Sequence, residues 1–283
     1  MNKPRTIAGP GKICYNTRSK SALKRREKLM KIRFLGTGAA DWREPVNGEF
    51  RALSSTLFDE KLLIDGTMMV RDRITHPEKI TDMLLTHPHS DHFDLELIRS
   101  LAPIRVHAHS SWADRISGEG VEVVPFEYFE SFQAAGYTVL PMEANHLPEP
   151  KDEGAVHFVL QDGEKTVLYA TDGAWLLTRE WYALTKFSLD AAIFDATIGE
   201  GYPGDYRIFE HNSIEMLRII LRTMRQPMFA KHNASGHIHP VLKAGAPVYL
   251  THMARTLHGP QGEVDASLRP EFCPAHDGME VTV

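Results

Sequence analysis

Cysteine is scarce in this chain of 283 residues, where Cys14 and Cys273 are the only two. Two thiols cannot form a disulfide framework or a cysteine-rich zinc site, so a reducing, cytoplasmic setting is expected. The sequence also lacks any apolar run of the ~18 residues that a membrane span needs, and no membrane association is expected. Neither an internal repeat nor a clear linker divides residues 30–283, which we expect to form one domain.

Acidic residues are nearly missing from the first 29 positions, which hold nine Lys or Arg and one acid, Glu27. This segment has no apolar core like that of a signal peptide. It is either a basic arm for nucleic acid or anionic membrane, or a disordered tail, or a stretch ahead of a true start at Met30. We favour the disordered tail, with the folded domain over residues 30–283.

The distribution of apolar residues predicts an α+β fold. Apolar runs bounded by turn-forming residues predict strands, and Asp162-Gly163 between two such runs predicts a hairpin. Asn212 and Glu215 resemble a capping box ahead of the clearest helical spacing. The predicted strands cover 31–35, 55–59, 61–65, 82–86, 105–108, 121–126, 136–143, 156–161, 165–171, 191–194 and 247–250, and the predicted helices cover 93–101, 175–187 and 213–225. Many hairpins with few helices favour two packed sheets with helices outside.

Histidine, by contrast, is abundant, with 15 residues in the chain. Its main concentration is Thr86-His-Pro-His-Ser-Asp-His92, directly after a predicted apolar strand. Three imidazoles and a carboxylate this close together would be unfavourable in a core without a partner. In a bent loop, His87 and His89 can face one metal ion while Asp91 and His92 face a second. Neutral imidazole and carboxylate suit zinc, and manganese or iron also fit these donors.

Two metal sites need more ligands than this loop offers, and three other strand ends supply them. His146 follows the strand predicted at 136–143, and His252 follows the one at 247–250. Asp172 follows the strand at 165–171, where it can bridge both metals. Taken singly, a His or Asp at a strand end more often has a structural role than a metal-binding one. Together they repeat one pattern, in which an apolar strand is followed by a ligand.

These motifs resemble the metallo-β-lactamase superfamily over nearly all of residues 30–283, including Phe34-Leu-Gly-Thr-Gly38 and the strand Leu62-Leu-Ile-Asp65. The resemblance implies a four-layer αβ/βα sandwich with metals at one edge between the sheets. It also implies that Asp65 supports the histidine loop rather than binding metal. It assigns one metal to His87, His89, His146 and Asp172, and the other to Asp91, His92, Asp172 and His252.

Two divalent ions bridged by a carboxylate can produce hydroxide near neutral pH and neutralise an attacked phosphate or carbonyl group. Hydrolysis is therefore the expected reaction. The stretches Phe194-Asp-Ala-Thr-Ile-Gly199, His211-Asn-Ser213 and Leu250-Thr-His252 resemble a phosphodiesterase branch of the superfamily. That branch contains the PhnP-type phosphoribosyl cyclic phosphate phosphodiesterases and, further off, ribonuclease Z.

The branch resemblance makes His211 the acid that protonates the leaving oxygen, with Asp91 as the other candidate catalytic residue. It implies a small cyclic or nucleotide-like phosphodiester, cleaved by a metal-bridging hydroxide. Only 25 residues separate His146 from Asp172, which leaves no room for the tRNA-binding arm of ribonuclease Z.

Other assignments stay open. A lactonase or other carboxylic-ester hydrolase would use the same metals, and a nucleic-acid-binding or inactive scaffold protein would use the basic arm. The expected partner is a small-molecule phosphodiester; nucleic acid is not favoured, and a homodimer is left open. Arg51, near the expected cavity mouth, is a further candidate anion partner. Residues 226–247 look like an insertion that either lines the pocket or forms a solvated loop, with Lys231, His232, His237 and His239.

Overall fold

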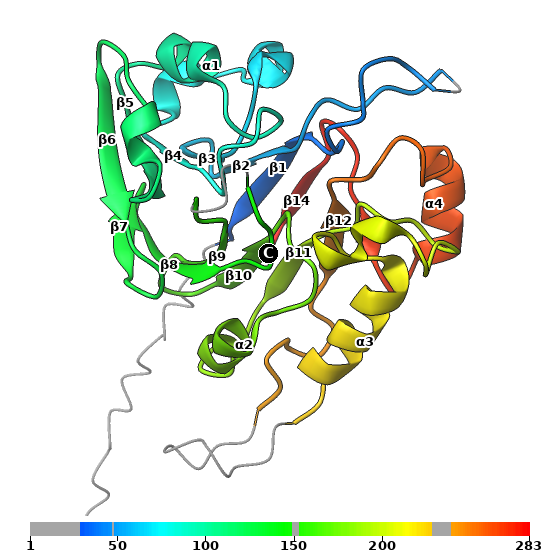
Figure 1. Cartoon of the computed structure of the whole chain (residues 1–283). Coiled ribbons are helices and arrows are strands. Elements are labelled where there is room, and N and C mark those ends of the chain that lie inside the picture. Colours follow the sequence, from blue (N-terminus) through cyan, green and yellow to red (C-terminus); the bar gives the residue numbers. More distant parts are fainter. Residues whose placement is uncertain (1–28, 47, 149–152, 228–238) are drawn as a thin grey trace, which may run out of the picture.

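The computed structural model describes residues 29–46, 48–148, 153–227 and 239–283. In these residues the chain forms two mixed sheets of seven strands each (Figure 1). Across the first sheet the strands are β14 (Glu280–Thr282), β1 (Lys31–Gly36), β2 (Ser55–Phe58), β3 (Leu62–Ile64), β4 (Asp82–Leu84), β5 (Ile104–His109) and β6 (Val121–Phe126). Across the second they are β13 (Cys273–Pro274), β12 (Val248–Thr251), β11 (Ala191–Asp195), β10 (Thr166–Ala170), β9 (Val156–Gln161), β8 (Tyr137–Glu143) and β7 (Phe132–Ala134).

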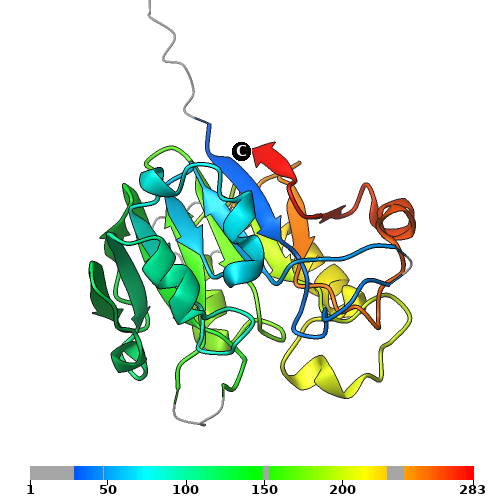
Figure 2. The same ribbon diagram turned by 90° about the horizontal axis from the view of Figure 1, so that it is seen from above.

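Short helices fill the connections and cover the outer faces of both sheets, as Figures 1 and 2 show from two directions. The α-helices are α1 (Leu95–Ser100), α2 (Thr178–Leu184), α3 (Ile214–Met224) and α4 (Gln261–Leu268). The 3-10 helices are η1 (Met68–Arg73), η2 (Pro77–Lys79), η3 (Ala113–Arg115) and η4 (Tyr206–Phe209). None of the helices in the described part of the chain has the length and apolarity to cross a membrane.

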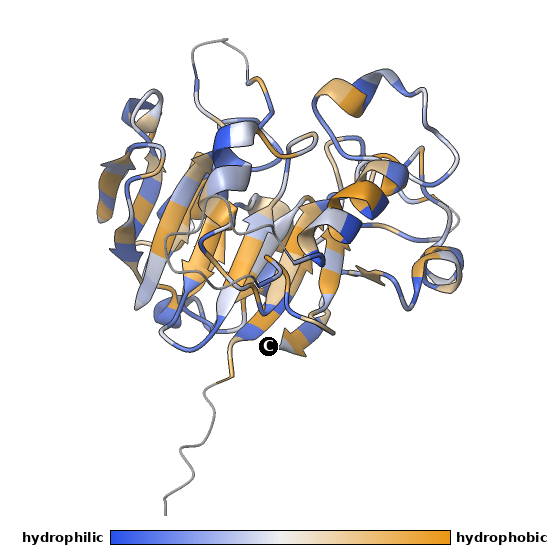
Figure 3. Cartoon of the chain, turned by 90° about the horizontal axis from the view of Figure 1, so that it is seen from below, coloured by the Kyte–Doolittle hydropathy of each residue, from blue (hydrophilic) through white to orange (hydrophobic). Residues whose placement is uncertain are grey.

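Three hydrophobic clusters hold the layers together. The inner strands of both sheets are buried on both faces, so the middle of the sheets is mostly hydrophobic in Figure 3. Along β10, Val167 and Tyr169 pack between the two sheets, while Leu168 and Ala170 pack toward α2 and α3. A third cluster joins the outer face of the first sheet to α1. The order helix, sheet, sheet, helix is the predicted four-layer αβ/βα sandwich of an α+β protein.

Strand direction brings several chain segments to one edge of the second sheet. β10, β11 and β12 are parallel to one another. β9 is antiparallel to both β8 and β10, so β8 runs in the same direction as β10. The carboxyl ends of these four strands therefore lie at the same edge, where the loops that follow them can meet.

Most predicted elements are present with shifted ends. The Asp162-Gly163 hairpin joins β9 to β10, but α1 and α2 are shorter than the helices predicted at 93–101 and 175–187. The capping prediction was wrong by one residue. Ser213 caps α3 by accepting a hydrogen bond from the Met216 amide, at 3.2 Å. The short elements β7, β13, β14 and α4 were not predicted, because their apolar patterns are too brief to stand out.

Two predicted segments lie largely outside the described residues. The basic tail predicted for residues 1–29 is described only at Leu29, which is exposed. In the predicted insertion at 226–247, Lys231, His232 and His237 also fall outside. The described end of that segment returns to the fold, because Val241 and Leu242 are buried against the second sheet.

Candidate metal centre

The loop between β4 and α1 is bent so that its histidines converge. The backbone amides of His92 and Phe93 both donate to the carbonyl oxygen of His89, at 3.0 and 2.9 Å. The ring of His87 consequently lies 4.5 Å from that of His89 and 4.4 Å from that of His92, centroid to centroid. Asp94 ends the loop by capping α1, accepting from the Glu96 amide at 2.8 Å.

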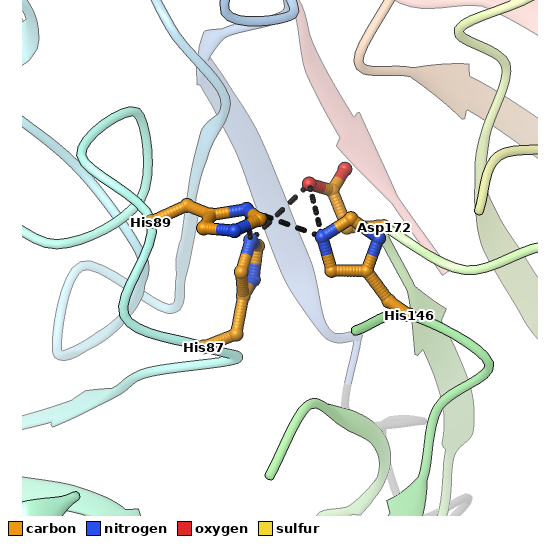
Figure 4. A group of neighbouring side chains, drawn as sticks. All are labelled: His87, His89, His146 and Asp172. Atoms are coloured by element: carbon orange, nitrogen blue, oxygen red, sulfur yellow. Dashed lines mark hydrogen bonds and ion pairs between the residues drawn. The ribbon is translucent and has the colours of Figure 1, made fainter. Parts of the chain in front are cut away.

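A first group of donors consists of His87, His89, His146 and Asp172, drawn in Figure 4. His89 Nδ1 lies 2.9 Å from His87 Nε2 and 3.2 Å from His146 Nε2. Asp172 Oδ2 lies 3.4 Å from His87 Nε2. Ligands of a tetrahedral zinc ion, at bond lengths of 2.0–2.1 Å, would be about 3.3 Å apart. The spacing of these atoms therefore fits one cation.

A second group consists of Asp91, His92, Asp172 and His252. His92 Nε2 lies 3.3 Å from Asp91 Oδ2, 3.1 Å from Asp172 Oδ2 and 3.3 Å from His252 Nε2. The same oxygen of Asp172 is thus close to ring nitrogens of both groups. The structure brings together all seven residues predicted as ligands, in the two predicted sets with Asp172 common to both.

Residues behind the two groups fix the histidine rings. Asp65 accepts from the amide and hydroxyl of Thr86 at 2.8 and 2.7 Å, and its Oδ2 lies 2.8 Å from His92 Nδ1. Thr197 Oγ1 lies 2.8 Å from His252 Nδ1. Holding Nδ1 in this way turns Nε2 of each ring toward the other donors, as partners of metal-binding histidines do.

The backbone is strained where it directs these side chains. Asp65, Asp172 and His252 have φ values of 52°, 56° and 54°, in the left-handed region that non-glycine residues seldom adopt. Each follows the end of a strand, and the sharp turn aims its side chain into the space between the sheets. Such strain tends to gather at functional sites.

Burial and charge also fit a pair of cations. Burial lowers the pKa of His87 well below its usual range and lowers that of His146 to about 4, so both rings are neutral at pH 7 and can bind a metal. Burial would also lower the pKa of His252, but Asp172 and Asp91 raise it to about 10. The buried carboxylates thus favour positive charge beside them, which divalent cations would supply.

A histidine outside the two groups faces the same space. His211 Nδ1 lies 2.7 Å from Asp195 Oδ2 and 3.9 Å from Asp172 Oδ1. Asp195 ends β11, is fully buried, and also accepts from the Thr197 amide at 2.6 Å. Although burial would lower the pKa of His211, the carboxylate of Asp195 raises it. The ring is therefore oriented with Nε2 free for a ligand and is biased toward its protonated form.

These residues open onto a cavity of about 180 Å³. Its walls include predicted residues and others that the sequence did not single out. The lining residues are Ala39, Ala40, Asp41, His89, Asp91, His146, Asp172, Thr197, Arg207, Glu210, His211, His252 and Ala254. Arg207, Glu210 and Asp41 carry no local pattern that could have revealed them. Asp195 had a signal, because it repeats the pattern of an acid at the end of an apolar strand.

The prediction for Arg51 was wrong. Its side chain is buried away from the cavity, where it donates to Thr37 Oγ1 at 2.8 Å and to the carbonyl oxygen of Ala275 at 3.0 Å. Its other terminal nitrogen donates to Gln261 Oε1 at 2.6 Å. A guanidinium with these partners ties the strand ends together and leaves little to offer an anion.

Comparison with known proteins shows which of them share this architecture. The family model described as a beta-lactamase superfamily domain matches residues 58–233. No curated protein matches the sequence. Among solved structures, the metallo-beta-lactamase fold protein YhfI from Bacillus subtilis has a TM-score of 0.64 at 17% identity, covering 90% of this chain and 100% of that one.

Two further solved structures are similar over nearly their whole length. A diphosphatase from the PhnP family has a TM-score of 0.66 at 18% identity, covering 90% of this chain and 98% of its own. The short form of human tRNase Z has a TM-score of 0.62 at 17% identity, covering 89% and 98%. At such low identity these likenesses establish the shared fold.

Proposed function

The chain belongs to the beta-lactamase superfamily, and from this premise we propose that it is a dinuclear metal-dependent phosphodiesterase acting on a small cyclic or nucleotide-like phosphodiester. One observation carries the proposal: two sets of donors share Asp172, and an Asp195–His211 pair stands beside them over a common cavity. Solved structures named as a diphosphatase of the PhnP family and as a human tRNase Z have the same fold, and these names support the proposal.

The two groups of donors support a proposed set of ligands. His87, His89, His146 and Asp172 would hold one divalent ion, and Asp91, His92, Asp172 and His252 the other, with zinc favoured by the nitrogen-rich set. When bound, such ions supply an activated water near neutral pH and positive charge against phosphoryl oxygens. Asp65 and Thr197 keep the rings of His92 and His252 in the orientation that this binding requires.

His211 supplies the acid. Asp195 holds its Nδ1–H, so Nε2–H is directed to the cavity and donates a proton to the leaving oxygen as the bond from phosphorus to that oxygen breaks. Asp91 also lines the cavity, and the charge of His92, with hydrogen bonds from His252 and His92, keeps its pKa low despite burial. It therefore stays a carboxylate, able to hold the attacking water by accepting a hydrogen bond from it.

Elemental analysis and a substrate panel test this proposal. The purified protein should hold two equivalents of zinc or manganese and should cleave bis-(p-nitrophenyl) phosphate or ribose cyclic phosphates rather than lactones. His211→Ala should lower kcat on phosphodiesters by roughly 10²–10⁴-fold while both metals are retained. His76→Ala is the matched control, since His76 is exposed and does not line the cavity.

Three outcomes would redirect the assignment. Faster turnover of lactones, with little effect of His211→Ala, would indicate a carboxylic-ester hydrolase on the same metals. Bound metal without turnover of either class would indicate a scaffold. A folded protein that takes up no metal would refute the proposal at its base.

A further inference from the structure

The helix η4 and the residue after it present three different faces. In a 3-10 helix, side chains three residues apart lie on the same side. Arg207 and Glu210 share the face that lines the cavity. Ile208 lies against the small cluster that contains Ala39 and Ile198, and so anchors the turn to the protein. The remaining face carries Tyr206 and Phe209, which are 80% and 77% exposed.

This aromatic face borders the cavity. The guanidinium of Arg207 lies 5.4 Å from the centre of the Tyr206 ring. Nε and one terminal nitrogen of that guanidinium each donate a hydrogen bond of 2.8 Å to the carboxylate of Asp205. Arg207 is therefore fixed in place with its second terminal nitrogen left for a ligand, and Tyr206 is next to the cavity wall that Arg207 forms.

The size of the cavity limits what can lie inside it. At about 180 Å³ it is smaller than the roughly 300–1,000 Å³ of sites that enclose a small organic ligand. It has room for the reacting phosphate and its immediate substituents. Any larger group of the substrate must extend past the rim, and η4, which ends two residues before His211, carries the exposed rings of Tyr206 and Phe209 there.

We infer that Tyr206 and Phe209 form a stacking platform for a planar ring of the substrate, of the nucleobase class, while Arg207 binds a non-bridging oxygen of the phosphate in the cavity. The inference rests on the proposed phosphodiesterase function and narrows its substrate to nucleotides. Aromatic side chains bind bases through their faces, and a guanidinium binds phosphate through a rigid set of donors. Both chemistries occur side by side on one turn.

A matched pair of substrates tests the platform. Adenosine 2′,3′-cyclic phosphate and ribose 2,3-cyclic phosphate share the reacting group and differ in the base. The wild-type kcat/KM should be at least tenfold higher for the nucleotide. In Tyr206→Ala/Phe209→Ala this ratio should fall about tenfold, mainly through KM, because a base stacked on an aromatic ring loses affinity of that order when the ring is removed.

Two variants serve as controls. Tyr206→Phe keeps the ring and should keep the ratio. Tyr182→Ala removes a tyrosine of similar type, 56% exposed on α2 and not part of the cavity, and should also keep it. Binding gives a second readout that needs no turnover. By calorimetry, adenosine monophosphate should bind more tightly than ribose 5-phosphate, and the double alanine variant should remove the difference.

The outcomes separate this inference from the function on which it rests. If metals bind and phosphodiesters are cleaved, but the double variant leaves the substrate ratio and the binding of adenosine monophosphate unchanged, the platform is refuted and the phosphodiesterase stands. If the double variant instead dissociates a dimer without changing nucleotide binding, the face is a protein contact and the inference is wrong. Absence of metal and of all hydrolysis would refute the proposed function itself.

Discussion

Replacing Gly173, the residue after Asp172, by alanine should displace the carboxylate that both donor groups share. A Cβ at this position would lie 2.5 Å from Nε2 and 2.6 Å from Cε1 of His157. His157 has no room to retreat, because it is fully buried and its Nδ1 lies 2.7 Å from Oε1 of the equally buried Glu180. The loop that carries Asp172 must move instead.

The required movement can be estimated. Ordinary contact begins near 3.4 Å, so relief of the clash needs a shift of about 1 Å. Metal sites tolerate about 0.2 Å in ligand distance, and a misplacement of about 1 Å costs roughly 10²-fold in rate. We therefore expect Gly173→Ala to lower kcat/KM about 100-fold, to weaken metal retention, and to reduce the free energy of unfolding by about 1–3 kcal/mol.

The assay combines metal content after dialysis, kcat/KM on a phosphodiester, and thermal unfolding. Gly262→Ala is the matched control, because Gly262 lies in α4 with no atom within 4 Å of the added Cβ. It should retain metal and activity and gain about 0.5–1 kcal/mol of stability. A folded Gly173→Ala protein with two bound metals and wild-type turnover would show that the geometric argument is wrong.

Three more predictions concern the same site. Removal of metals by a chelator should lower the melting temperature by roughly 10 °C or more, because two ions at about 100 times their dissociation constants add about 5 kcal/mol to the free energy of unfolding. Calorimetry with and without zinc measures this shift. An unchanged melting temperature would exclude tight metal binding. Asn212→Ala should lower the free energy of unfolding by about 2–4 kcal/mol, measured with urea, because Asn212 is fully buried and its loss leaves two backbone partners unpaired. Those partners are the carbonyl of Gly173, at 2.7 Å, and the amide of Trp175, at 2.9 Å. Asn145→Ala removes a side-chain hydrogen bond to the carbonyl of Ala174 in the same loop and should also lower the free energy of unfolding. Wild-type stability in both variants would show that these hydrogen bonds do not hold the loop.

The four-layer fold and the arrangement of the seven candidate ligands could be predicted because each ligand is local to a strong signal. A buried strand is a run of apolar residues, and the residue directly after it is where a side chain can reach the edge of the sheet. His146, Asp172 and His252 each occupy such a position, after β8, β10 and β12. The resemblance to a known family predicted that these residues come together, and the directions of the paired strands explain why they do.

Residues that act through long-range contacts left no such signal. Arg207 lines the cavity because of the way η4 packs on the protein. A single Arg between Tyr and Ile shows no periodicity that would predict this position from the sequence. Arg51 failed as an anion partner for the opposite reason. Its partners Gln261 and Ala275 come from the far end of the chain, so its neighbours in sequence gave no warning that its donors were already used.

The asparagines beside two of the histidines show how the site depends on such contacts. Asn145 precedes His146 and donates to the carbonyl of Ala174, and Asn212 follows His211 and donates to the carbonyl of Gly173. Both amides therefore bind the loop that starts at Asp172, and they set how far each histidine stands from the shared carboxylate. In sequence, Asn212 has the typical position of a helix cap. Because Ser213 caps the helix, the side-chain amide of Asn212 can instead bind Gly173 and so fix His211 relative to Asp172. Replacing either asparagine should therefore change the positions of the candidate ligands without removing one of them.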